Sequence, residues 1–179
     1  VQASTSKTIA IGTANTVASS ASSAITIGTS NTVTSTASSA IAIGNENSVG
    51  GTNNAAVGTN INVVNSAQHS VGIGDAVTIG GGSIGAGTLV NDGQKNIGIG
   101  YKVTAQGSSN IVLGDSAEIT GGAVNNTIVF GTNASATGSN ALAIGAGATA
   151  GSSGSIALGL NASANAVNSI VLGNSAGIG

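Results

Sequence analysis

The side chains that could carry out acid–base chemistry or bind a metal are few and scattered. The chain has 179 residues, one of them histidine and five of them acidic. No carboxylate neighbours His69 in sequence, which is typical of an exposed turn residue rather than a catalytic base. The acidic residues are Glu46, Asp75, Asp92, Asp115 and Glu118. Because they do not recur at the spacing of metal ligands, we expect no catalytic residue, no metal and no cofactor.

Composition excludes other classes of function. Gly80-Gly81-Gly82 could suggest a phosphate-binding loop, but no Gly-Lys-Ser/Thr follows, so a flexible turn is expected. Charged residues make up 4% of the chain and the formal net charge is −2. Three basic residues cannot neutralise many phosphates, so we expect no nucleic-acid partner. No apolar run approaches the roughly 20 residues of a membrane-spanning helix, so we expect no membrane contact.

Charge is concentrated in one stretch of the chain. Six of the eight charged residues fall between 75 and 118, and Tyr101 lies in the same stretch. Loops held on a rigid scaffold often carry function. The candidate partner-binding residues are therefore Asp75, Asp92, Lys95, Tyr101 and Lys102. The alternative is that an irregular loop needs polar groups only for solubility.

A short sequence motif, repeated along the chain and called the phrase below, must form the scaffold that positions these residues. An aliphatic residue, a small residue, an aliphatic residue and glycine recur eleven times, with minor variation. The closing glycines are Gly12, Gly28, Gly44, Gly58, Gly74, Gly100, Gly114, Gly131, Gly145, Gly159 and Gly173. Regular recurrence over the whole length predicts a repeat architecture and a single domain over 1–179.

Each repeat predicts two short strands joined by tight turns. The phrase alternates with period two, and a weaker strand follows it at 15–17, 31–33, 47–49 and 134–136. Frequent glycine and clustered β-branched residues disfavour helix. We therefore expect an all-β fold, a parallel β-roll (solenoid) of 14–16-residue coils. The 26-residue gap between Gly74 and Gly100 predicts an irregular insertion at about 75–96.

The alternation assigns the phrase two faces. We expect its first and third aliphatic residues to fill the roll, with Phe130 as core filler. The small middle residues would then form a contact seam against another copy of the chain, and the alternative is a weakly apolar exposed face. The predicted seam consists of Ala10, Thr26, Ala42, Ala56, Gly72, Gly98, Val112, Val129, Ala143, Ala157 and Val171.

Several copies carry a family resemblance. The runs 139–148, 69–74 and 168–173 resemble the degenerate head repeat of YadA-like trimeric autotransporter adhesins, and the resemblance covers essentially the whole chain. It implies a left-handed roll in each of three chains packed around a common axis. It also implies a bacterial cell-surface location, as the extracellular head of an outer-membrane-anchored protein. The implied partners are matrix proteins such as collagen, fibronectin or laminin, cells, abiotic surfaces, and sister bacteria in autoagglutination.

Two other functions remain as alternatives. An ice-binding solenoid needs a flat threonine ladder, but the early threonines do not hold one register in the sequence. These are Thr8, Thr13, Thr16, Thr26, Thr29, Thr32 and Thr34. A hexapeptide-type acyltransferase with His69 as base needs an aliphatic residue at every sixth position, and isoleucine does not recur at that spacing. We therefore expect an adhesive structural head and not an enzyme.

Overall fold

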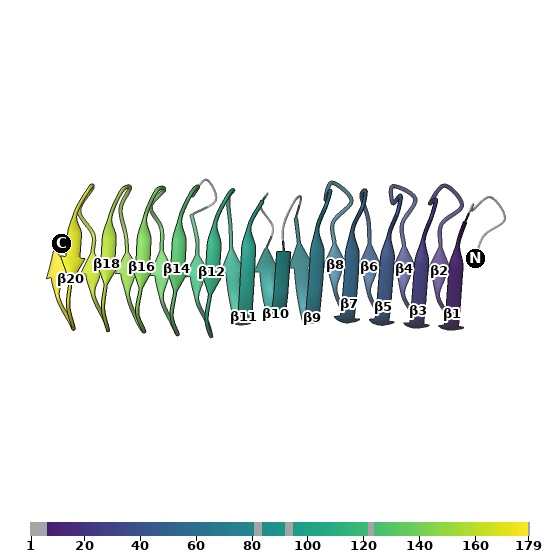
Figure 1. Ribbon diagram of the computed structural model, residues 1–179, viewed down its shortest axis with the longest axis horizontal. Helices are drawn as coiled ribbons and strands as arrows, with labels where there is room; N and C mark the ends of the chain where they lie inside the picture. The colour runs from purple at the N-terminus through teal and green to yellow at the C-terminus, as the bar shows by residue number, and fades with distance from the viewer. Residues whose placement is uncertain (1–6, 81–83, 92–94, 122–123, 179) are drawn as a thin grey trace. The chain divides into compact units, whose positions relative to one another are not determined.

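The protein is an all-β parallel solenoid. The computed structural model describes residues 7–80, 84–91, 95–121 and 124–178, and these contain strands and turns but no helix. The chain divides into two compact units, Val1–Thr88 and Leu89–Gly179, where the sequence suggests one domain. The boundary falls within strand β10, Ile84–Asn91 (Figure 1).

The first unit builds each coil from one longer and one shorter strand. The longer strands form a wide ladder, in which Ile9, Ile25, Ile41, Ala55 and Val71 pair in parallel register. Its strands are β1 (Ile9–Thr13), β3 (Ile25–Thr29), β5 (Ile41–Asn45), β7 (Ala55–Thr59) and β9 (Val71–Ile79). The shorter strands form a narrow ladder of β2 (Thr16–Val17), β4 (Thr32–Val33), β6 (Ser48–Val49) and β8 (Asn62–Val63). β8 in turn pairs with the second half of β9.

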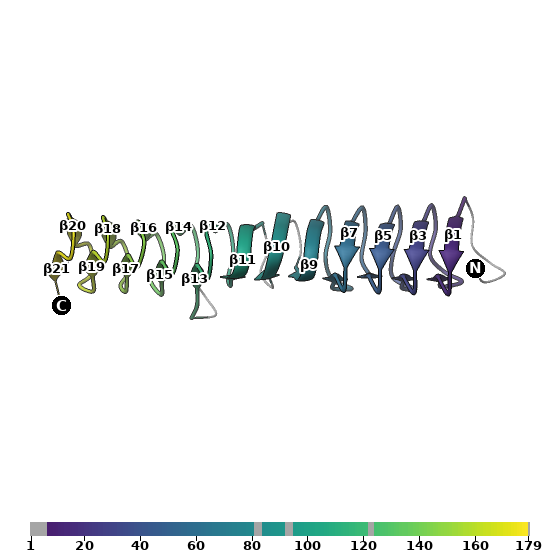
Figure 2. The same cartoon turned by 90° about the horizontal axis from the view of Figure 1, so that it is seen from below.

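The second unit repeats this plan. Figure 2 shows its wide and narrow ladders on opposite sides of the roll. The wide ladder consists of β11 (Ile97–Ala105), β12 (Ile111–Leu113), β14 (Ile128–Phe130), β16 (Leu142–Ile144), β18 (Ile156–Leu158) and β20 (Ile170–Leu172). The narrow ladder consists of the end of β11 and then β13 (Glu118–Ile119), β15 (Ser135–Ala136), β17 (Thr149–Ala150), β19 (Ser163–Ala164) and β21 (Gly177–Ile178).

These strands confirm the predicted repeat and correct the predicted insertion. All eleven copies of the phrase form wide-ladder strands, and the expected weaker strands appear as β2, β4, β6 and β15. The insertion expected to be irregular instead contains strand, because β9 continues to Ile79 and β10 occupies Ile84–Asn91. Residues 81–83 and 92–94, including Asp92 and part of the glycine run, lie outside the described residues.

The closing glycine of the phrase turns the chain from one ladder toward the other. Gly145 has a φ of 131°, which side chains of L-residues rarely adopt. A Cβ atom at this position would also collide with the carbonyl oxygen of Gly159 in the next coil. Glycine is therefore required both by backbone conformation and by the close approach of successive coils.

The interior of the roll is narrow and filled by small or β-branched side chains. The middle residues of the phrase point inward, and Ala42, Ala56, Val112, Val129 and Ala143 are fully buried. On the opposite side, the narrow ladder contributes inward valine and isoleucine side chains. These are Val17, Val33, Val49, Val63, Ile79, Val103 (which precedes the paired end of β11) and Ile119. The hydrophobic core of each unit thus consists mainly of small and β-branched side chains enclosed by its coils.

This arrangement reverses the predicted faces of the phrase. The prediction that the middle residues face another chain is wrong, because they are enclosed within their own roll. The buried members are Thr26, Ala42, Ala56, Gly72, Gly98, Val112, Val129, Ala143, Ala157 and Val171, whereas Ala10 on the first strand is exposed. The physical reason is the space left by the narrow-ladder side chains, which admits a small residue opposite them but not a pair of isoleucines.

A ladder of asparagine side chains closes one corner of the first unit. Asn31 Nδ2 donates to the carbonyl oxygens of Ile27 and Gly44, at 3.1 and 2.8 Å. Its Oδ1 atom accepts from the backbone and side-chain nitrogens of Asn47. Asn31 is fully buried, so these bonds satisfy polar groups that water cannot reach. The corner therefore fixes the register between successive coils.

Candidate interaction surfaces

The first candidate surface is an apolar face on the outside of the wide ladder. The aliphatic residues that flank each buried middle residue point away from the roll, as expected from the period-two alternation of a strand. In the first unit Ile11 is 56% exposed and Ile73 is 47% exposed. The face has two columns, Ile9, Ile25, Ile41, Ala55 and Val71, and Ile11, Ile27, Ile43, Val57 and Ile73.

The second unit carries the same apolar face with larger side chains. Its columns are Ile97, Ile111, Ile128, Leu142, Ile156 and Ile170, and Ile99, Leu113, Phe130, Ile144, Leu158 and Leu172. Phe130, predicted as core filler, is instead 55% exposed, and Leu172 is 64% exposed. Contiguous exposed apolar surface of this kind is typical of an interaction site.

The second candidate surface is the outside of the narrow ladder, which is polar. In the second unit one column of outward residues comprises Thr104, Glu118, Ser135, Thr149 and Ser163. In the first unit the equivalent column comprises Thr16, Thr32, Ser48, Asn62 and Thr78. We call these columns the hydroxyl face, since most members are serine or threonine. Each coil thus presents apolar side chains on one side and hydroxyl groups on the other.

Some early threonines share a register that the sequence analysis did not expect. Thr13 pairs with Thr29, and Thr16 pairs with Thr32. Thr26 lies in the buried middle position instead. Along the chain both columns change to other residues, since Asn45 follows Thr29 and Ser48 follows Thr32. The columns are therefore mixed polar ladders rather than a continuous threonine ladder.

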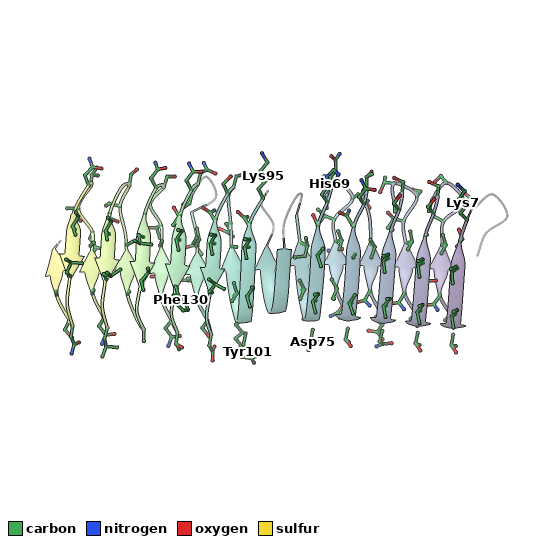
Figure 3. The ribbon with its side chains drawn as sticks, in the orientation of Figure 1. Lys7, His69, Asp75, Lys95, Tyr101 and Phe130 are labelled. Carbon is green, nitrogen blue, oxygen red and sulfur yellow. The ribbon has the colours of Figure 1, made fainter. Side chains whose placement is uncertain are left out.

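The described members of the predicted partner-binding set are Asp75 in the first unit and Lys95, Tyr101 and Lys102 in the second. Within the second unit, Lys95 lies at one edge of the roll and Tyr101 at the opposite edge (Figure 3). Tyr101 is 55% exposed, and the Nζ atom of Lys102 lies 5.2 Å from the centre of its ring. In the first unit, Asp75 is exposed on β9 in register with Thr59. Of the three described predicted residues in the second unit, the structure therefore brings Tyr101 and Lys102 together and places Lys95 apart from them.

The edge at Tyr101 continues onto the following coil. The backbone nitrogen of Ser116 donates to the carbonyl oxygen of Tyr101 at 2.7 Å, so Asp115 and Ser116 lie beside Tyr101 and Lys102. Glu118 is exposed in register with Thr104. One coil therefore carries the aromatic ring and the ammonium group, and the following coil carries the two acidic residues Asp115 and Glu118. The sequence analysis missed Asp115 and Glu118 here because the coil length that stacks them was not yet known.

The remaining chemistry-bearing residues lie apart. His69 is an exposed turn residue, as predicted, and its Nε2 atom lies 3.3 Å from Asn53 Nδ2. It lies at the opposite edge of the first unit from Asp75 (Figure 3). Within the described part of the chain, no three His, Cys, Asp or Glu side chains gather closely enough to hold a metal ion.

Comparison with known proteins adds no relative. No model of a protein family matches the chain, and no curated protein is significantly similar to it. Among the described residues there is no helix long and apolar enough to cross a membrane.

Proposed function

We propose that this chain is the head of a bacterial surface adhesin that acts as a homotrimer. The observation that supports it best is the two-faced coil, with an apolar face on the wide ladder and a hydroxyl face on the narrow ladder. Exposed isoleucine, leucine and phenylalanine in continuous columns favour burial against other copies of the same chain. The resemblance to YadA-like heads supplies the number of chains and the expected left-handed coiling.

The proposed trimer places each wide ladder toward the common axis. Side chains such as Ile144 and Leu158 would then lose their contact with water, while the hydroxyl face would stay outside. The wide ladder rather than the predicted middle residues would form the seam. Burying each aliphatic side chain contributes on the order of 1 kcal/mol to association, given that part of its surface is already covered.

The hydroxyl face gives the proposed assembly its means of attachment. Serine and threonine hydroxyls both donate and accept hydrogen bonds, so they suit many polar partners. Their repetition along three chains would let many weak contacts act together. The expected partners remain collagen, fibronectin or laminin, cells, abiotic surfaces and sister bacteria, with the head displayed outside an outer-membrane anchor.

Binding of coated beads tests this function. Beads carrying the chain are applied to collagen, fibronectin, laminin, cultured cells and bare polystyrene, and the retained fraction is measured under flow. We expect retention on at least one surface, reduced severalfold by Thr149→Asp with Ser163→Asp on the hydroxyl face. A matched pair on exposed turns of neighbouring coils, Ser153→Asp with Asn168→Asp, controls for added charge. If trimeric chain is retained nowhere above beads carrying albumin, the adhesin proposal is wrong.

A further inference from the structure

One edge of the second unit carries two matched acceptor sequences for asparagine-linked sugar. The chain contains three Asn-X-Ser/Thr sequences, at Asn125, Asn133 and Asn161. This tripeptide is the acceptor of N-glycosylation where it lies on the surface of an exported protein. We propose that Asn133 and Asn161 are glycosylated and that Asn125 is not. The proposal rests on the surface location given under the proposed function and not on adhesion itself.

Asn133 and Asn161 occupy the same place in the coil. Each follows the wide-ladder strand by three residues, and each has a positive φ of 54°. The backbone nitrogen of Asn133 donates to Asp115, and that of Asn161 donates to Ala146, so the two lie in one column with Gly147 between them. They are two coils apart, a separation of about 10 Å at the usual strand spacing.

The folded roll leaves both acceptor amides in solvent. Asn133 and Asn161 are exposed, the following alanines are buried, and Ser135 and Ser163 point outward on the narrow ladder. Among the described residues, neither asparagine side chain forms a hydrogen bond to another group. A large hydrated sugar could therefore be attached at this edge without disturbing the interior or the apolar face.

The third acceptor sequence gives an internal contrast. Thr127 is fully buried, and its hydroxyl donates to the carbonyl oxygen of Gly138 at 2.9 Å. The Oδ1 atom of Asn125 accepts from the backbone nitrogen of Ser108 at 2.9 Å. A sugar on Asn125 would break this bond and crowd the neighbouring coil. Asn60 supplies a second contrast, since it has the same positive φ but Asn62 stands where a hydroxyl is needed.

The modification would use a sugar activated as a nucleoside diphosphate. The Asn133 Nδ2 atom forms a bond to the anomeric carbon of the sugar, and the bond from that carbon to the diphosphate oxygen breaks. The nucleoside diphosphate leaves with the electron pair of the broken carbon–oxygen bond, and Nδ2 loses one proton to a base. The product would hydrate an edge of a protein that has only eight charged residues with which to remain soluble.

Peptide mapping by mass spectrometry tests the proposal on chain isolated from the cells that produce it. We expect sugar on the peptides containing Asn133 and Asn161 and none on those containing Asn60 and Asn125. Ser135→Ala should remove the sugar from Asn133 alone, and Ser135→Thr should restore it, with the melting temperature unchanged in both. Unmodified Asn133 and Asn161 would overturn the proposal, as would sugar on Asn60 or sugar that persists in Ser135→Ala.

Discussion

The two ladders differ in where their larger aliphatic side chains point: outward on the wide ladder and inward on the narrow ladder. On the wide ladder the larger aliphatic residues face outward and a small residue faces inward, as at Leu142, Ala143 and Ile144. On the narrow ladder a hydroxyl residue faces outward and an aliphatic residue faces inward, as at Thr32 and Val33. The difference gives the roll one polar side that suits water and one apolar side whose burial would be favourable.

The largest expected effect comes from placing charge on the apolar face. Ile144→Asp with Leu158→Asp should abolish the proposed trimer, because an unpaired carboxylate buried between chains costs several kcal/mol. We expect association to weaken by roughly a hundredfold or more, since every 1.4 kcal/mol is about tenfold. Light scattering after size exclusion measures the change in mass.

The matched control places the same charges on the hydroxyl face. Thr149 and Ser163 pair in register, as Ile144 and Leu158 do. Thr149→Asp with Ser163→Asp should leave the association unchanged, because this face meets water in either state. Equal loss of association in both double variants would contradict the proposal that the apolar face, and not the hydroxyl face, lies between chains.

The next effect separates the inside of the roll from its outside. Ala143→Leu, made in the monomeric Ile144→Asp, Leu158→Asp background, should lower the free energy of unfolding by about 1–3 kcal/mol, because the interior has no room for a larger side chain. Urea denaturation followed by circular dichroism measures it. Ile156→Leu, on the outward face, serves as the control with little change. An unaltered midpoint for Ala143→Leu would mean that Ala143 faces solvent in the monomer.

The smallest effect concerns one bulky member of the apolar face. Phe130→Ala should weaken association by about 1 kcal/mol per chain, since roughly half of a side chain worth 1.5–3 kcal/mol remains to be buried. The free energy of unfolding of the monomeric background should fall by no more than about 1 kcal/mol, because only the other half of the Phe130 side chain is covered within its own chain. Sedimentation velocity across a dilution series detects the shift, and a large loss of monomer stability would contradict the outward position.

The sequence predicted the repeat, its strands and its parallel stacking, but it did not predict which face of the phrase lies inside. Alternation of residue types along a strand shows which residues share a face, but it does not show which of the two faces is enclosed. The narrow ladder determines which face of the wide-ladder strand is enclosed, because its Val33 is buried and its Thr32 is not. With valine already inside, the middle residue of the same coil is the compact Thr26, which is fully buried. Reading both strands of a coil together would have supplied this signal.

The sequence also predicted the candidate partner-binding residues only in part. Tyr101 and Lys102 were predicted because they lie in the stretch where charge is concentrated, and the Nζ atom of Lys102 lies over the Tyr101 ring. Lys95 was included because it is close in sequence, yet it lies at the other edge of its unit. Asp115 was separated from the predicted set although one coil brings it beside Tyr101. Sequence proximity is a poor guide in a solenoid, where neighbours are one coil length apart.

Sedimentation equilibrium of the unaltered chain tests the central claim most directly. The claim is that the apolar face of the wide ladder is covered by identical chains. Across a wide range of loading concentrations, we predict a single species of three times the 16.5 kDa chain mass. A folded monomer of 16.5 kDa that does not associate at high concentration would contradict the claim, because its isoleucine and leucine columns would then remain in water.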